Sequence, residues 1–242
     1  MINSKKDYEY YIEADRIAKA LPKKQSLTSW LKNLLLPNHI WEFQKTLRKL
    51  EFYKNCRKDK ISFIYQFLLT RKFNKLSLKL GFSIPTNVFG PGLSIAHHGT
   101  IVINGGAKIG ANCRLHACVN IGTEAGYGAK APNIGDNCYI GPGVKMYGKI
   151  SIANGTAIGA NAVVNKSSHE ENIAIAGVPA KKIADVDTRD FLIPATMIIE
   201  SGYNERNDLK GLTSRELKEK LKAAKNIYKI GEIVENPAPQ SL

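Results

Sequence analysis

Three of the five histidines in this 242-residue chain, His97, His98 and His116, fall in one stretch of repeating sequence. A neutral imidazole can take a proton from an attacking hydroxyl group at pH 7. It can also ligate a metal ion, but a histidine zinc site needs a third ligand at suitable spacing, and His169 lies beyond the last repeat. The sequence therefore predicts proton transfer by one of the adjacent pair His97 and His98, and no metal site.

The histidines stand within a six-residue repeat. An aliphatic residue, once replaced by Phe, returns every sixth position, with a two-residue slip after Ile101 and a longer gap after Ile121. The repeat positions are Phe89, Ile95, Ile101, Ile103, Ile109, Leu115, Ile121, Ile134, Ile140, Met146, Ile152, Ile158 and Val164. A period of six fits neither an amphipathic helix nor a hairpin meander. With glycine often following the aliphatic residue, it is typical of a parallel β-helix, whose coils bury these residues against one another.

One insertion interrupts the repeat. Ile121 and Ile134 are thirteen residues apart rather than six, so the segment 122–133 must protrude as a loop. It contains Glu124, Tyr127 and Lys130 among small residues. Loops extruded from a regular scaffold often carry function. We therefore expect these three side chains to contact a substrate.

The formal net charge of +14 lies mostly before the repeats. Residues 1–80 hold 18 Lys and Arg against 7 Asp and Glu, whereas residues 81–184 hold 8 against 4. This excess suits an anionic membrane surface or an acidic polymer, and equally a solvated helical surface. No nucleic-acid motif accompanies it, so we predict no nucleic-acid partner. With no signal peptide, no long apolar segment and no CxxC pair, we expect a cytoplasmic protein with reduced thiols.

Apolar residues at helical spacing predict helices on both sides of the repeats. Before them we expect helices over 7–20 and 26–36, a third capped by Asn38 and a fourth ending at Gly81. We expect most of the aligned apolar residues of the fourth helix in the core. The aligned residues are Ile61, Ile64, Tyr65, Leu68, Leu69, Phe73, Leu76 and Leu80. After the repeats, a capping box predicts a helix over about 214–228.

The hexads, the histidine segment 93–103, the loop and the Ala-Gly-Val-Pro-Ala-Lys segment at 176–181 together resemble the hexapeptide-repeat acyltransferases. The resemblance is closest to their serine acetyltransferase branch and covers roughly residues 82–184. It implies a left-handed β-helix of triangular section, a trimer, and acetyl-CoA bound between adjacent subunits. It also places His97 at the position of the family's catalytic base, with His98 as the alternative if the register shifts by one residue.

The resemblance also locates the cofactor, in the later coils and at the exit from the repeats. The expected acetyl-CoA contacts are Gly141, Pro142, Gly159, Ala160, Lys166, Ala176, Lys181 and Lys182. The three lysines would meet the phosphates, although a lysine taken alone is more often a solvated charge. A backbone N–H near Gly122 or Gly141 is the expected donor to the oxyanion.

The chain departs from the family where serine would bind. Phe82 and Ala96 stand at the positions of two acidic residues, and Lys130-Ala131 replaces an Arg-His pair. Recognition of a zwitterion requires paired opposite charges, so these replacements favour another acceptor. The pattern resembles the polysaccharide-modifying relatives. In that interpretation Phe82 meets the apolar face of a sugar ring.

Two further side chains are assigned in the same interpretation. His116 is expected to contact the acceptor or to serve a structural role. Without the family's upstream acid, either Glu124 or a backbone carbonyl would orient His97 by a hydrogen bond that fixes its tautomer.

We therefore predict a mainly β protein: a helical domain over 1–82, a left-handed parallel β-helix acetyltransferase domain over 83–184, and a C-terminal extension with one helix over 185–242. The predicted activity is acetyl transfer from acetyl-CoA to a sugar hydroxyl of a capsular, exo- or lipopolysaccharide or its precursor. The expected assembly is a homotrimer or a dimer of trimers, with the basic helices as a contact to the inner face of the membrane. The alternatives are a serine O-acetyltransferase of cysteine biosynthesis and an inactive β-helix that serves as an assembly scaffold.

Overall fold

The computed structural model describes residues 1–22, 35–128 and 130–200. The helices predicted at 26–36 and 214–228 therefore lie outside the described residues, the first except for its last two positions. The described helices are α1 (Lys5–Ala18), α3 (His39–Cys56), α4 (Lys60–Leu80), a 3-10 turn (Thr188–Asp190) and α5 (Ala195–Glu200). Asn38 caps α3 through its side chain, and Gly81 ends α4 in the left-handed conformation, as predicted.

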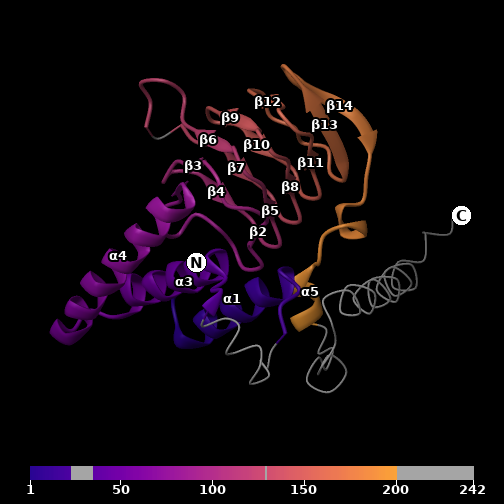
Figure 1. The fold of residues 1–242 in the computed structure, drawn as a ribbon. Helices are drawn as coiled ribbons and strands as arrows, with labels where there is room; N and C mark the ends of the chain where they lie inside the picture. The colour runs from indigo at the N-terminus through magenta and orange to yellow at the C-terminus, as the bar shows by residue number, and fades with distance from the viewer. Residues whose placement is uncertain (23–34, 129, 201–242) are drawn as a thin grey trace, which may run out of the picture.

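Short strands follow the helices and wind into a solenoid (Figure 1). They are β1 (Phe82–Ser83), β2 (Ser94–Ile95), β3 (Ile101–Ile103), β4 (Lys108–Ile109), β5 (Arg114–Leu115), β6 (Asn120–Gly122), β7 (Asn133–Ile134), β8 (Tyr139–Ile140), β9 (Lys145–Tyr147), β10 (Ser151–Ile152), β11 (Ala157–Ile158), β12 (Val163–Val164), β13 (Ile173–Gly177) and β14 (Ala180–Asp185). Sheet A has the order β1-β3-β6-β9-β12, sheet B β10-β7-β4, and sheet C β14-β13-β11-β8-β5-β2.

The chain passes through sheets C, A and B in turn, so each circuit adds one strand to every sheet. All pairings are parallel except that of β13 with β14, which turns the chain back on itself. Three parallel sheets around one axis form a β-helix of triangular section, and this prediction is confirmed. The segment 122–133 leaves the corner between sheets A and B as a loop, at the upper left of Figure 1.

The hexad residues form the core because equivalent strands stack in register. In sheet C, Ile95 lies on Leu115, which lies on Ile140, and these side chains are fully buried. The slip after Ile101 reflects a three-residue strand. Ile101 and Ile103 both point inward around the exposed Val102, since side chains alternate along a strand.

Glycine after the aliphatic residue has a steric cause. A Cβ on Gly110 would lie 2.6 Å from the carbonyl carbon of Gly135 in the next coil, and a Cβ on Gly90 would lie 2.7 Å from that of Gly110. No real side chain tolerates such contacts with backbone. The glycines therefore allow the backbone of successive coils to meet at one corner.

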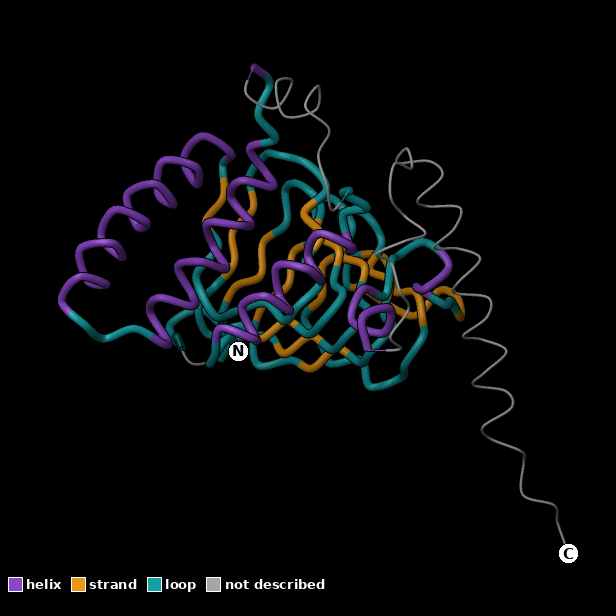
Figure 2. The backbone as a smooth tube through the Cα atoms, turned by 90° about the horizontal axis from the view of Figure 1, so that it is seen from below, coloured by secondary structure: helices purple, strands orange, loops and turns teal. Residues whose placement is uncertain are grey.

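The helices cover the first end of the β-helix (Figures 1 and 2), and a buried arginine forms the junction. Arg48 is fully buried; its Nε donates to Asp15 at 2.8 Å and one terminal nitrogen donates to Glu51 at 3.1 Å. The same guanidinium donates to the carbonyl oxygens of Phe89 and Gly90, at 2.9 and 2.6 Å. The first coil has no preceding coil to bond to, so these carbonyls would otherwise be buried and unpaired.

Other helical side chains complete the same covering. The bonds to the first coil are Gln44 Nε2 to the Leu93 carbonyl at 2.7 Å, Lys19 Nζ to the Ile95 carbonyl at 2.7 Å, the Leu93 N–H to Asp15 Oδ1 at 2.8 Å and the Asn87 N–H to Glu51 Oε1 at 2.7 Å. Side chains of α1 and α3 thus replace the missing coil. The C-terminal part returns to the same end, where α5 packs on α1 and Thr196 bonds to Asn112.

The burial of the apolar side chains on α4 differs from the prediction. Leu69, Leu76 and Leu80 are buried, as expected, but Ile61 and Ile64 are 82% and 64% exposed. The expectation of core packing is therefore wrong for the latter two and for Leu68, which is 54% exposed. The reason is geometric: α4 packs through its other side, and no described element covers this one. None of the described helices combines the length and apolarity needed to cross a bilayer.

Replacing Arg48 with Ala should lower the free energy of unfolding by about 3–5 kcal/mol, because two buried carboxylates lose their partner. Chemical denaturation would measure the change. Lys5→Ala is the control, since Lys5 pairs with Glu9 at 3.8 Å on the surface and should contribute little. Equal stabilities of the two variants would contradict the role given to Arg48.

Candidate functional site

His97 and His98 lie at the corner between β2 of sheet C and β3 of sheet A, and both are exposed. The corner follows the fully buried Ile95, whose stacking on Leu115 holds the turn in place. The His97 ring lies 5.8 Å, between centroids, from that of His116 in the next coil. The β-helix thus brings together two of the three predicted histidines.

His116 is half-buried beneath this corner. Arg114, two residues earlier on the same face of the strand, donates from Nε to His116 Nε2 at 3.3 Å. Burial lowers the pKa of His116, and the positive charge of Arg114 lowers it further. His116 is therefore neutral at pH 7, with Nε2 as the acceptor and the proton on Nδ1.

An aromatic ladder continues from His116 along sheet C. The ring of Tyr139 lies 4.9 Å from His116, and Phe191 lies 5.4 Å from Tyr139 at a near-perpendicular angle. These residues and Arg114 line an open pocket of about 520 Å³. Its remaining wall is mostly apolar and comprises Ala157, Ile158, Gly159, Ala174, Ile175, Ile183 and Val186.

A row of small residues continues the strand position of His116 through the later coils. We call Gly141, Gly159 and Ala176 the small-residue row. A Cβ on Gly141 would lie 2.6 Å from the Ile158 carbonyl oxygen, and one on Gly159 would lie 2.9 Å from Cβ of Ala176. No long side chain therefore fills this strip, and the exposed Pro142 and Ala160 flank it. Gly159 and Ala176 are partly exposed, whereas Gly141 is buried against the backbone of the next coil, so an extended ligand would reach the row at its last two members.

The predicted oxyanion donor at Gly141 is not available. Its N–H donates to the Ile158 carbonyl at 2.9 Å, within the ladder that joins consecutive coils. A group already bonded in this way cannot also serve an oxyanion. The donor must be sought at another backbone group.

The predicted phosphate-binding lysines differ from one another. Lys182 forms ion pairs with Glu170 and, at 2.8 Å, with Asp185, and the hydrogen bonds to these carboxylates raise the pKa of its ammonium group. A phosphate would have to displace them. Lys166 and Lys181 are exposed, and their ammonium groups have no hydrogen bond or ion pair in the described part of the chain. These two remain suited to an anionic ligand.

The loop 122–133 contains three of the predicted substrate contacts, Glu124, Tyr127 and Lys130. Lys130 pairs with Glu124 at 2.9 Å, and its Nζ lies 3.8 Å from the centre of the Tyr127 ring. This loop leaves the corner between sheets A and B, whereas His97 stands at the corner between sheets C and A. Glu124 is therefore paired within the loop and does not orient His97 of the same protomer.

Phe82 does not line the site, and its predicted contact with a ligand is corrected here. It is buried at 5% exposure, where its ring packs edge-on against Phe43 at 5.1 Å. The side chain points inward because β1 belongs to the first, helix-covered end of sheet A, and Phe82 lies in register beneath Ile101. Its ring belongs to the core that joins the helices to the β-helix.

Four residues of this region were not predicted: Arg114, Tyr139, Phe191 and Lys19. Arg114 could have been found, since it and His116 flank the buried Leu115 and must face outward together. Lys19 donates to the Ile95 carbonyl, and its pKa is lowered to about 8 by burial and then by the charge of Arg114. Nothing in the repeat indicates Lys19 or Phe191, because tertiary folding brings them here.

No group of three or more His, Cys, Asp or Glu side chains arranged to hold a metal occurs among residues 1–22, 35–128 and 130–200.

Parts of this chain are similar in sequence to a known protein family and to curated proteins. The bacterial transferase hexapeptide model (six repeats) matches residues 131–166. The serine acetyltransferase of Mycobacterium tuberculosis (strain ATCC 25618 / H37Rv) is 35% identical over 100 residues, which are 41% of this chain and 43% of that protein. The chain thus spans less than half the length of this curated relative.

Solved structures agree over a longer part of the chain. The serine acetyltransferase of Brucella abortus strain S19 superposes with a TM-score of 0.58 at 21% identity, covering 76% of this chain and 71% of that one. Its complex with coenzyme A gives 0.55 at 20% identity, covering 75% and 70%. The Neisseria gonorrhoeae enzyme in complex with serine gives 0.53 at 25% identity, covering 74% and 68%. The prediction of a left-handed parallel β-helix is thereby confirmed.

The prediction of a sugar acceptor is wrong. The relatives and structural neighbours above are named serine acetyltransferases, which supports the second interpretation of the sequence and gives no support to capsule or polysaccharide synthesis. That prediction relied on replaced side chains, one of which, Phe82, lies in the core. The β-helix of this chain carries the bacterial transferase hexapeptide repeat and, in sequence and in fold, is similar to the serine acetyltransferases.

Proposed function

We propose that this chain is an acetyl-CoA-dependent serine O-acetyltransferase in which His97 is the general base. One observation carries the proposal: an exposed histidine stands at a β-helix corner, beside a row without long side chains. It does so in the region similar to enzymes named for this reaction. The small-residue row would bind the extended arm of acetyl-CoA, and Lys166 and Lys181 its phosphates.

The reaction is a direct acyl transfer. His97 takes the proton of the serine hydroxyl as the oxygen attacks the thioester carbonyl, and the C–S bond breaks as the tetrahedral intermediate collapses. The imidazolium then returns the proton to the leaving thiolate, which leaves O-acetylserine and free coenzyme A. His116 is neutral at pH 7, so it adds no positive charge to oppose the protonation of His97.

Arg114 would supply a positive charge for the serine carboxylate. Its guanidinium faces the pocket beneath the catalytic corner and uses only Nε in the bond to His116 among the described residues. The remaining nitrogens suit a carboxylate, which guanidinium groups bind through paired hydrogen bonds. With this assignment, the positive charge that binds serine stands at a position other than that of the family's Arg-His pair.

The active species is proposed to be a homotrimer. His97 and the loop with Glu124 stand at different corners of one protomer, so they can serve one site only when they come from neighbouring subunits. In that assembly Glu124 would face the ammonium group of serine, opposite the base. A closed ring of three copies satisfies this head-to-tail contact.

His97→Ala should lower kcat by about 10²–10⁴-fold, the usual contribution of a positioned base, while coenzyme A affinity measured by calorimetry stays near wild type. His169→Ala is the matched control, because His169 is exposed and lies outside the site. His98→Ala should have a smaller effect. A larger loss in His98→Ala than in His97→Ala would move the base by one residue, and no acetyl transfer to serine in the wild type would favour an inactive scaffold.

Ala160→Phe should weaken acetyl-CoA binding about tenfold or more, because the new ring would cover the strip beside the small-residue row. Ala160 is exposed, so the unfolding temperature should not change. Calorimetric titration with coenzyme A and a thermal melt would measure the two quantities. Unchanged affinity in a folded variant would remove the row from the cofactor site.

Mixing His97→Ala and Glu124→Ala subunits should restore activity that neither variant has alone. In a randomly mixed trimer, about a quarter of the interfaces would carry both wild-type groups. Turnover after co-expression and light scattering of the mixture would measure this. Restoration fails if both groups act within one protomer or if the active species is a monomer.

A further inference from the structure

The outward side of α4 carries large apolar side chains that no described element covers. We define the outer face of α4 as Ile61, Phe63, Ile64, Phe67 and Leu68, which are between 54% and 82% exposed. They occupy the N-terminal half of the helix, which projects away from the β-helix in Figure 1. An amphipathic helix normally turns such a face inward. Here the opposite side, with Leu69, Leu76 and Leu80, already makes the contact with the protein core.

The charges on α4 are of one sign. The helix has five basic residues, Lys60, Arg71, Lys72, Lys75 and Lys79, all exposed, and no Asp or Glu. At 100° per residue, Lys60, Ile64, Phe67, Arg71 and Lys75 fall on one stripe. Lys72 pairs with Glu42, and Lys79 contacts His39. Lys60, Arg71 and Lys75 have no such partner in the described part of the chain.

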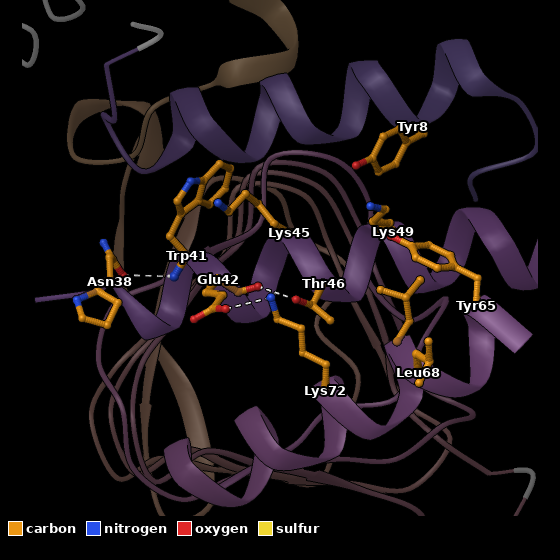
Figure 3. Close-up of a pocket in the computed structure, with 12 residues that line it drawn as sticks. Tyr8, Asn38, Trp41, Glu42, Lys45, Thr46, Lys49, Tyr65, Leu68 and Lys72 are labelled. Carbon is orange, nitrogen blue, oxygen red and sulfur yellow. Dashed lines mark hydrogen bonds and ion pairs between the residues drawn. The ribbon is translucent and has the colours of Figure 1, made fainter. Parts of the chain in front are cut away.

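A basic hollow adjoins this face. It has a volume of about 670 Å³ and lies between α1, α3 and α4, with Leu68 and Lys72 on its α4 side (Figure 3). Lys45 lies 5.8 Å from the centre of the Trp41 ring, and Lys49 lies 5.0 Å from that of Tyr65. Among the described residues that line it, Glu42 is the only acidic one, against three lysines. Apolar side chains next to lysines and amphipathic aromatic rings are the composition of a membrane-surface site.

We propose that the outer face of α4 docks on a bilayer that contains anionic lipids. Its apolar side chains would enter the boundary between headgroups and acyl chains. Lys60, Arg71 and Lys75 would lie among the headgroups, and Lys45 and Lys49 in the hollow would bind a lipid phosphate. A second copy of the chain fits less well, because a symmetric contact through α4 would bring its basic side chains against those of its partner.

Sedimentation of the full chain with vesicles tests this inference. The protein should bind vesicles of phosphatidylcholine mixed with phosphatidylglycerol and should not bind phosphatidylcholine alone. Binding should weaken as salt is raised, because ions screen the attraction between lysines and headgroups. Equal binding to both vesicle types, or binding to neither, would overturn the proposal.

Substitutions in α4 separate the apolar contribution to vesicle binding from the electrostatic one. Ile64→Ser with Phe67→Ser should weaken vesicle binding at least about tenfold, since two large apolar side chains are lost from the bilayer contact. Arg71→Gln with Lys75→Gln should weaken it as well and reduce the salt dependence. Tyr147→Ser is the matched control, because Tyr147 is a 45% exposed aromatic residue on β9, in the β-helix. It should leave binding unchanged.

Light scattering of the same variants tests the alternative, in which a second copy of the chain covers the outer face of α4. If Ile64→Ser with Phe67→Ser instead reduces the size of the assembly and leaves vesicle binding intact, a second copy covers α4 and the proposal is wrong. The substituted side chains are exposed, so circular dichroism should report a folded protein in each case. Vesicle binding is measured without substrates, so its outcome is independent of the proposed acetyl transfer.

Discussion

The buried hydrogen bonds of Arg48 with Asp15 and Glu51 determine how the N-terminal helices cover the first coil of the β-helix. A β-helix builds each coil on the one before it, so the first coil lacks partners for its backbone groups. Arg48 satisfies two carbonyls of that coil while two carboxylates hold its own charge, and side chains of α1 and α3 bond to the rest. The helices therefore act as the missing coil, and the position of every later coil follows from this junction.

The register of the strands has a further consequence. Because equivalent strands pair without a shift through sheets A and C, a residue type at one position becomes a row along the β-helix. Rows of inward-facing residues form an aliphatic core, and rows of outward-facing residues form surfaces of uniform composition. The small-residue row is one such surface, and it meets the ladder from His97 to Phe191 at His116. A base at a corner, next to a row without long side chains, suits a reaction in which a long cofactor lies along the solenoid.

The departures from the serine acetyltransferase pattern have unequal weight once the fold is known. Phe82 lies in the core, where an acid would be costly to bury, so the loss of an acid there accompanies the packing against Phe43. Ala96 and Ala131 do leave the acceptor side with fewer charges. Arg114 and the loop glutamate, which stand at other positions, would supply them. The α4 surface belongs to a different part of the molecule, the helical end in Figure 1, so the proposed membrane contact is separate from the corner that holds His97.

The sequence by itself determined the β-helix and the place of the loop, because a period of six with buried aliphatic residues has few other solutions. The resemblance of the segment 93–103 to the serine acetyltransferase branch also singled out His97, which the structure places exposed at a corner. Tertiary structure alone decided which outward residues meet. His116 faces His97 because the coils stack in register, Phe191 arrives from outside the repeat, and Glu124 bonds to Lys130 within its own loop. The same holds for α4, where helical periodicity marks an apolar stripe at Ile64 and Leu68 as readily as at Leu69 and Leu76. Periodicity describes one helix, whereas burial depends on which side a neighbouring element covers.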